Sequence, residues 1–360
     1  QLIEALQSGE YDLDNTSVMM TQTGGGCRAT NYIPLLRKAL IDAGFPQVPV
    51  VSLSMGNQGT EKGFKFTVPL LTRFMIAVLY GDLFERVVYR TRPYEATEGS
   101  VNELHAKWLE KARKNVESGS IFEFNRNMKK IVTEFDQIEL LDIQKPRVGV
   151  VGEILVKYSK TANDDIVSII EEEGGEAVVL DLIGFMNYSL YNQIWKADEI
   201  GFSKKNKLMA KTFIGIINML EKPMNKALKA SKRFDSIESI YDIAASTEEV
   251  ISIGNHTGEG WFLTGEMIEL LQKGVNNIIC LQPFGCLPNH IVGKGMMKEL
   301  RRQYPGANLA PIDYDPGVSA VNQLNRIRLM MTTAKKRMNT TSKSVEESER
   351  ESEMETAQAY

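Results

Sequence analysis

Cysteine is scarce in this chain: only Cys27, Cys280 and Cys286 occur among 360 residues. A small secreted domain held together by disulfides carries a denser set, so this class of protein is excluded. Reduced thiols are expected instead. A reduced thiol placed in a loop can serve as a metal ligand, so the positions of the three cysteines become informative.

Long apolar runs and a strong net charge are also missing. No stretch approaches the roughly 20 apolar residues that cross a bilayer, and no charged-then-apolar leader opens the chain. The formal charge is −4, which gives no indication of a nucleic-acid surface. We therefore expect a cytoplasmic protein with no membrane or nucleic-acid partner. Because the chain opens on Gln1 rather than Met, we also expect it to be a fragment of a longer polypeptide.

Apolar segments of strand length alternate with helical patterns along most of the chain. The strands are expected at residues 17–23, 48–53, 147–153, 176–180, 250–253, 275–281 and 308–313. Such alternation is typical of parallel sheets with helices on both faces. The predicted class is α/β, with two Rossmann- or flavodoxin-like, doubly wound parallel-sheet domains and helical insertions.

Changes of pattern suggest the domain boundaries. Residues 1–60 are expected to form the C-terminal part of a first α/β domain, and residues 61–145 a helical insertion or cap. Residues 146–333 are expected to form a second α/β domain with a helical lobe at about 184–248. The charged segment 334–360 has no apolar face, so a disordered tail or a frayed helix is expected.

Cys27 follows a predicted strand and three glycines, Gly24, Gly25 and Gly26, and precedes a predicted helix. A helix N-terminus favours a thiolate, because its backbone N–H groups lack partners there. One hypothesis makes Cys27 a metal or cluster ligand; the other makes it a small residue in a tight turn. The glycines favour the ligand, since they lose backbone entropy that packing alone does not require, and they leave space for a cofactor.

Cys286 has a similar setting. It follows the apolar run 275–281, which Pro283, Gly285 and Pro288 end in a tight loop. A cluster ligand and a buried cysteine in a turn are both open. Both thiols would then lie beyond the carboxyl ends of strands, in a site between the two α/β blocks. Cys280 lies inside the apolar run, so core packing is its better interpretation.

Three further residues could carry acid–base chemistry. His256 and Glu259 lie in a glycine-rich loop, and Glu153 follows the strand at 147–153. The alternative for His256 is a hydrogen-bonded structural role. The alternative for Glu153 is a solvated strand end.

Four motifs together resemble one protein family. They are TQTGGGCRATNY at 21–32, GEI at 152–154, GNHTGEGW at 254–261 and LQPFGCLPNH at 281–290. These residues are similar to the 2-hydroxyacyl-CoA dehydratase superfamily. More closely, they resemble the C-terminal, dehydratase-like region of large fused proteins described as CoA-substrate-specific enzyme activases. The resemblance covers roughly residues 10–333.

The resemblance implies an iron–sulfur protein of anaerobes with either a [4Fe-4S] or a double-cubane cluster. Cys27 and Cys286 would be cluster thiolates beside Gly24, Gly25, Gly26 and Gly285. An ATPase activator, in the same polypeptide or separate, would supply electrons of low potential for a dehydratase or reductase reaction. The substrate would be a CoA ester or another small molecule, and family members work as dimers.

One departure from the family leaves a second hypothesis open. The family uses a further cysteine from an earlier motif, whereas no cysteine precedes Cys27. The cluster could then be absent from this fragment. In that case the chain would be a scaffold, or a domain that binds a small molecule or CoA ester, and it would keep the fold without a complete cluster site.

Overall fold

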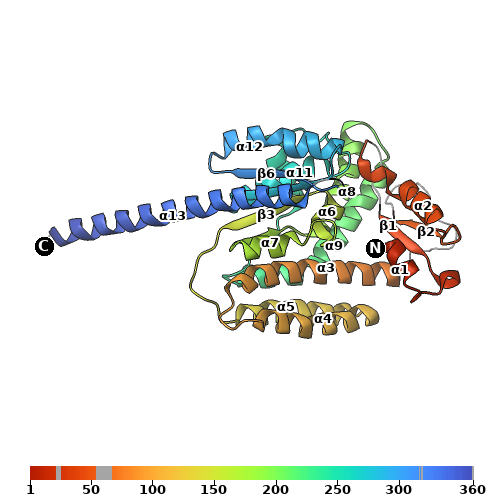
Figure 1. The fold of residues 1–360 in the computed structure, drawn as a ribbon, viewed down its shortest axis with the longest axis horizontal. Helices are drawn as coiled ribbons and strands as arrows, with labels where there is room; N and C mark the ends of the chain where they lie inside the picture. Colours follow the sequence, from red (N-terminus) through yellow and green to blue (C-terminus); the bar gives the residue numbers. More distant parts are fainter. Residues whose placement is uncertain (22–25, 54–66, 316, 318, 359–360) are drawn as a thin grey trace.

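The structure is a computed structural model. It describes residues 1–21, 26–53, 67–315, 317 and 319–358, with side chains through Thr340. Gly24 and Gly25 lie outside the described residues. The chain forms a mixed α/β protein with two parallel sheets, one of two strands and one of four (Figure 1).

The four-stranded sheet is the centre of the larger part. Its strands lie in the order β4-β3-β5-β6 and are all parallel; they are β3 (Arg147–Gly152), β4 (Glu176–Val179), β5 (Asn277–Gln282) and β6 (Asn308–Asp313). Val148, Val150 and Val151 of β3 are all fully buried, on both faces of the strand. A strand covered on both sides has no need of alternating polarity, which explains the continuous apolar run in the sequence.

Helices cover both faces of this sheet. On one face lie α6 (Ile154–Tyr158), α7 (Ile166–Glu172) and the first turns of α13 (Ala320–Gln358). On the other lie α11 (Gly260–Gln272), η4 (Asn289–Gly293), η5 (Lys294–Met296) and α12 (Met297–Gln303). Cys280 is buried in the second of these cores, so the predicted packing role is confirmed.

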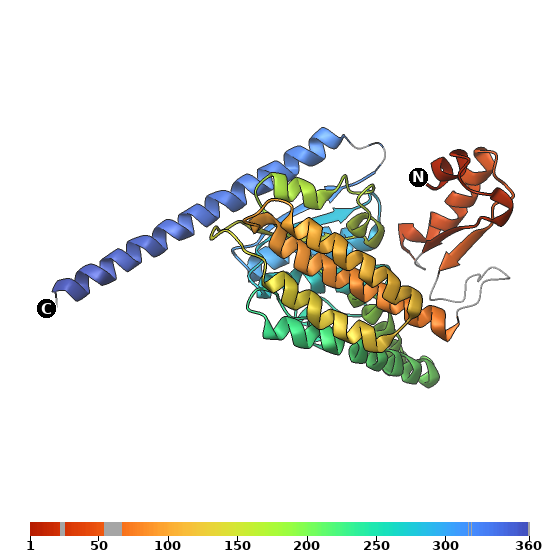
Figure 2. The same ribbon diagram turned by 90° about the horizontal axis from the view of Figure 1, so that it is seen from below.

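The two-stranded sheet belongs to a small N-terminal unit, red in Figure 2. Its strands β1 (Val18–Thr21) and β2 (Val50–Leu53) pair in parallel, and α1 (Leu2–Gln7), η1 (Leu13–Asn15), η2 (Arg28–Asn31) and α2 (Tyr32–Asp42) surround them. The unit has its own apolar core, which includes Val18, Ile33 and Leu40.

A helical bundle packs beside the larger sheet. It contains α3 (Val68–Thr91), η3 (Arg92–Tyr94), α4 (Ser100–Ser118), α5 (Ile121–Asp136), α8 (Leu182–Glu199) and α9 (Lys204–Ala230). One apolar cluster joins Leu79 and Phe124 to Met224. The helices predicted for the insertion and for the lobe therefore share a single core, although β3, α6, α7 and β4 separate them in sequence.

The predicted strand at residues 250–253 is wrong. This segment follows α10 (Ile240–Glu248) as a turn, in which the N–H groups of Val250 and Ile251 both donate to Thr247 O. Ile253 is buried against Trp261 in a cluster of helices rather than in a sheet. An apolar run of four residues satisfies either environment, so its polarity alone does not identify a strand.

The charged C-terminal segment continues α13 to Gln358, where the sequence favours a disordered tail or a frayed helix (Figure 1). The first turns bury Ile327, Met330 and Met331 against the sheet. Glu, Lys, Met and Ala are frequent beyond them and are strong helix formers. Propagation from an already formed helix needs no new nucleus.

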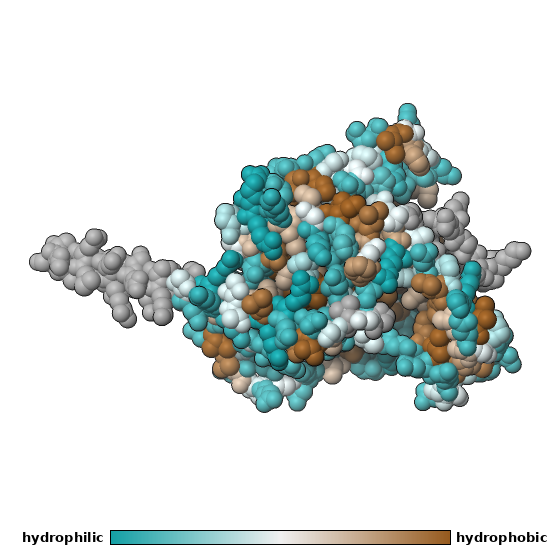
Figure 3. All heavy atoms as spheres, turned by 45° about the horizontal axis from the view of Figure 1, so that its top comes forward, coloured by the Kyte–Doolittle hydropathy of each residue, from teal (hydrophilic) through white to brown (hydrophobic). Residues whose placement is uncertain are grey.

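The face of the molecule in Figure 3 is mainly hydrophilic, with separate apolar patches. Within the described ranges, no helix combines the length and the apolar character that crossing a membrane requires.

Candidate metal centre

The candidate site lies where the strand order of the larger sheet reverses. From β3 the chain moves outward to β4, then returns to the other side of β3 as β5 and continues to β6. In open parallel sheets, such a reversal leaves a crevice beyond the carboxyl ends of the two central strands. Glu153 follows β3 at this edge, and Cys286 lies in the loop that follows β5.

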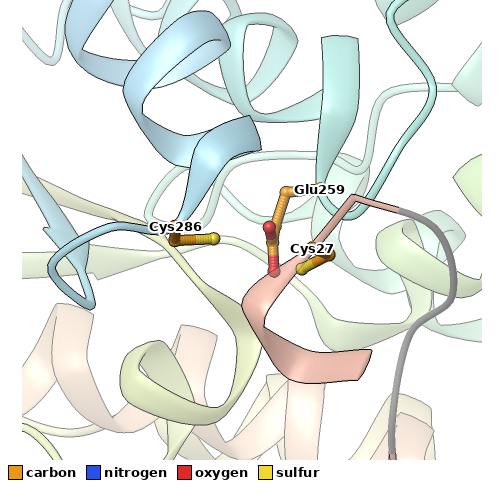
Figure 4. A group of neighbouring side chains, drawn as sticks. All are labelled: Cys27, Glu259 and Cys286. Atoms are coloured by element: carbon orange, nitrogen blue, oxygen red, sulfur yellow. The ribbon is translucent and has the colours of Figure 1, made fainter. Parts of the chain in front are cut away.

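Three potential metal ligands meet in this crevice. The Sγ atoms of Cys27 and Cys286 and a carboxylate oxygen of Glu259 all lie within 4.8 Å of one another. Figure 4 shows the two thiols pointing toward each other with the carboxylate between them. All three side chains are buried, and none of the cysteines forms a disulfide.

Each ligand comes from a loop at the end of a different element. Cys27 directly precedes η2, and Glu259 directly precedes α11. Cys286 lies between β5 and η4, a single turn of π-helix. Such turns are rare and occur frequently at functional sites. Gly285, predicted to bind the cofactor, has a φ of +72° in the Cys286 loop, which explains a glycine there.

Asn289, in the π-helical turn, orients two of the ligands. Its Nδ2 donates to Cys286 Sγ at 3.1 Å and to Glu259 Oε2 at 3.0 Å. The Asn289 side chain is fully buried, so it holds both groups in a fixed geometry.

The surroundings of Cys286 favour its thiolate. A hydrogen bond with the Cys27 thiol, together with donors from Asn289 and from the Arg28 backbone, lowers the Cys286 pKa to about 5 against the opposing effect of burial. Cys286 is therefore ionised at neutral pH. A thiolate is the form that binds metals.

Glu259 and Glu153, the two carboxyl groups at the crevice, both have pKa values above that of an exposed glutamate. Burial, with the nearby charges of Glu153 and Cys286, raises the Glu259 pKa to about 8. Burial also raises the Glu153 pKa to about 7, although Val156 N–H and Tyr32 Oη–H both donate to that carboxylate, at 2.8 and 3.2 Å. At neutral pH the Glu259 carboxyl is therefore mainly protonated, whereas the Glu153 carboxyl is close to its midpoint.

Two buried oxygens at the centre have no hydrogen-bond partner among the described residues: Glu259 Oε1 and Asn289 Oδ1. Leaving a buried polar atom unsatisfied costs about 1–3 kcal/mol. Two such atoms beside a thiolate suggest that the crevice receives a further group.

The remaining predicted residues lie farther out. The His256 ring packs against Trp195 with centroids 5.4 Å apart and is not in the three-ligand group. Burial lowers its pKa. Gly26 lies beside the Cys286 loop, since a Cβ there would be 3.7 Å from Leu287.

Sequence reasoning did not single out Tyr32, Gly258 or Asn289. A Cβ on Gly258 would lie 3.1 Å from Cys27 Sγ, and its φ of +62° also suits glycine. Tyr32 donates to Glu153. All three fall inside the quoted motifs, which were the only available signal.

Comparisons of the chain with models of protein families, with curated proteins and with solved structures found no match.

Proposed function

We propose that the protein is an iron–sulfur redox module whose centre is held by Cys27 and Cys286. The observation that carries this proposal is the meeting of two buried thiols that lie far apart in the sequence, with the Glu259 carboxylate beside them. Thiolates are the protein ligands of iron–sulfur clusters. The donor types suit such a centre, and the buried oxygens Glu259 Oε1 and Asn289 Oδ1 lack hydrogen-bond partners among the described residues.

The resemblance to 2-hydroxyacyl-CoA dehydratases supports the same function. The module would form part of an ATP-dependent reductase or dehydratase-like enzyme that receives electrons from an ATP-hydrolysing activator. The N-terminal unit would belong to a first doubly wound domain and the four-stranded sheet to a second. The substrate would be a small molecule or a CoA ester.

When bound, an iron–sulfur centre supplies one-electron transfer. The chain itself excludes water, because Cys27, Cys286 and Glu259 are at most 4% exposed. Glu153 and Tyr32, joined by a hydrogen bond, can hold a proton beside the centre. Asn289 donates hydrogen bonds to both Cys286 and Glu259 and so fixes their relative positions.

Anaerobic reconstitution with iron and sulfide tests the proposal. We expect the wild-type protein to gain a visible absorbance band and an electron paramagnetic resonance signal after reduction. Cys27→Ala and Cys286→Ala should each lose both signals. Cys280→Ala is the matched control and should keep them, because its side chain lies in the sheet core. Absence of a cluster in the reconstituted wild-type protein would refute the proposal.

A second candidate is a domain that binds a small molecule or a CoA ester without its own catalysis. A pocket of about 540 Å³ at the carboxyl ends of β5 and β6 favours it, because ligand pockets span about 300–1,000 Å³. Its lining combines apolar and polar side chains: Phe284, Ile312, Asp313, Asn322, Arg326 and Leu329.

Coenzyme A binding to the Cys27→Ala/Cys286→Ala variant tests this candidate apart from any cluster. Charge-assisted hydrogen bonds contribute about 1.5–3 kcal/mol, so Arg326→Gln should weaken binding by about 10-fold or more in equilibrium dialysis. Arg328→Gln is the control, since Arg328 pairs with Glu173 at 2.8 Å. Equal affinities for the two variants would exclude this pocket as the binding site.

A further inference from the structure

Among the buried carboxylates near the centre, Glu259 is the one that lies next to both thiols. One of its oxygens belongs to the group of three donor atoms, together with the sulfurs of Cys27 and Cys286. Glu153, the neighbouring buried carboxylate, is not in that group. Both oxygens of Glu153 already accept hydrogen bonds, from Val156 N–H and Tyr32 Oη–H.

The hydrogen bonding of Glu259 leaves one oxygen available. Oε2 accepts from Asn289 Nδ2 at 3.0 Å, whereas Oε1 is buried and has no hydrogen bond of normal geometry within the described residues. The backbone N–H groups of Glu259 and Ile154 act on the carboxylate and oppose the rise of its pKa. The side chain is 2% exposed, so bulk water does not solvate Oε1. A metal ion in the crevice would satisfy it.

The second contact of Asn289 supports the same arrangement. One nitrogen donates to both Glu259 and Cys286, which aligns an oxygen ligand with a sulfur ligand. Metal ligands are commonly held by such hydrogen-bonded neighbours, which fix their orientation. The Glu153 carboxylate is instead the N-cap of α6, where it accepts from Val156 N–H.

From these observations we infer that Glu259 is a third protein ligand of the metal, so that the centre is held by two thiolates and one carboxylate. The inference rests on the proposed metal-binding function of Cys27 and Cys286 and deepens it. Carboxylate oxygens bind both iron and zinc, alone or with sulfur ligands. Cys280 lies inside β5 and cannot serve as a third cysteine ligand, so Glu259 would supply the third ligand instead.

Cobalt binding tests the donor set without iron or sulfide. Metal-free, reduced protein is titrated anaerobically with Co²⁺, and charge-transfer and d–d absorbance report the ligands. We expect the wild type to bind one Co²⁺ with thiolate-to-metal absorbance. Glu259→Gln should weaken the affinity by about 10-fold or more and shift the d–d bands. Glu259→His, which restores a ligand, should recover most of the affinity.

The matched control is Glu221→Gln, which changes another buried carboxyl with an unpartnered oxygen, in α9 and outside the group of three donor atoms. We expect its cobalt affinity to stay within about twofold of the wild type, and circular dichroism verifies that each variant is folded. Equal affinity and equal d–d bands for Glu259→Gln and the wild type would overturn the inference. So would equal losses for Glu221→Gln and Glu259→Gln, or no cobalt binding by the wild type.

The cobalt result and the iron–sulfur result separate the two proposals. If cobalt binding depends on Glu259 but no cluster forms on reconstitution with iron and sulfide, the three-ligand site stands and the iron–sulfur function fails. If a cluster forms and Glu259→Gln leaves both its resonance signal and cobalt binding unchanged, the function stands and the Glu259 ligand is rejected.

Discussion

Glu259 and Cys286 lie side by side with pKa values displaced in opposite directions. The Glu259 pKa is raised to about 8, chiefly by burial, while the Cys286 pKa is lowered to about 5, chiefly by its hydrogen bond with Cys27. In the metal-free protein, the proton is therefore held on the carboxyl oxygen and not on the sulfur. This is the reverse of the order of the two groups in water.

The Glu259 shift predicts how stability depends on pH in the metal-free protein. Its folded-state pKa of about 8 lies above the ordinary value of 4.5, so its favourable contribution is complete below pH 4.5 and is lost as pH rises to about 8. Glu259→Gln removes this loss. In urea unfolding, the variant should gain stability relative to the wild type as pH rises from about 5 to 9.

A control and a contrary result define this prediction. Glu248→Gln changes an exposed carboxylate and should give a small stability difference at every pH. Cys286 acts in the opposite direction, because its lowered pKa adds stability as pH rises. The measured quantity is therefore the difference in unfolding free energy between the variant and the wild type at each pH. A difference between Glu259→Gln and wild type that does not change with pH would show that Glu259 is already ionised in the fold.

At the scale of elements, two helices begin at the crevice and are joined below it. Glu153 is the N-cap of α6 and Glu259 the N-cap of α11. About one turn into α6, Lys157 Nζ contacts Glu266 Oε1 of α11 at 2.6 Å, and both side chains are at most 2% exposed. The ion pair therefore connects α6 and α11, the two helices whose N-caps are the site carboxylates.

Breaking this ion pair from one side should be costly. Lys157→Met leaves the Glu266 carboxylate buried without its partner, and such changes cost about 3–5 kcal/mol. The double variant Lys157→Met/Glu266→Met removes both charges and should recover most of that loss. Urea unfolding at neutral pH gives both values. A single variant that loses less than about 1 kcal/mol would contradict the prediction.

For the whole molecule, the centre joins two parts of the fold. Cys27 comes from the N-terminal unit, whereas Cys286 and Glu259 come from loops around the four-stranded sheet. An ion pair between Arg28 and Asp315, 2.8 Å apart, also joins the two parts beside the thiols. A metal bound by all three residues would therefore link the N-terminal unit to the rest of the protein.

Most strands could be predicted because their evidence is local. Buried parallel strands need continuous apolar runs, and those at 147–153, 176–180, 275–281 and 308–313 correspond to β3, β4, β5 and β6. The segment at 250–253 failed because an apolar run also fits a turn packed against helices. The helical segments were predicted as helices, but the sequence did not predict that they share one core. Hydrophobic periodicity shows which face of a helix is buried and not which distant helix packs against it.

By itself, the sequence determined the class of fold, the burial of Cys280 and the choice of Cys27 and Cys286 as the informative thiols. Only the tertiary structure decided that Glu259 joins those two thiols, that Asn289 donates to both Glu259 and Cys286, and that Glu153 and His256 lie outside the group. The physical reason is that composition and periodicity report burial and local conformation. Which side chains share a crevice depends on the order of strands in the sheet and on the close packing of loops beyond their ends.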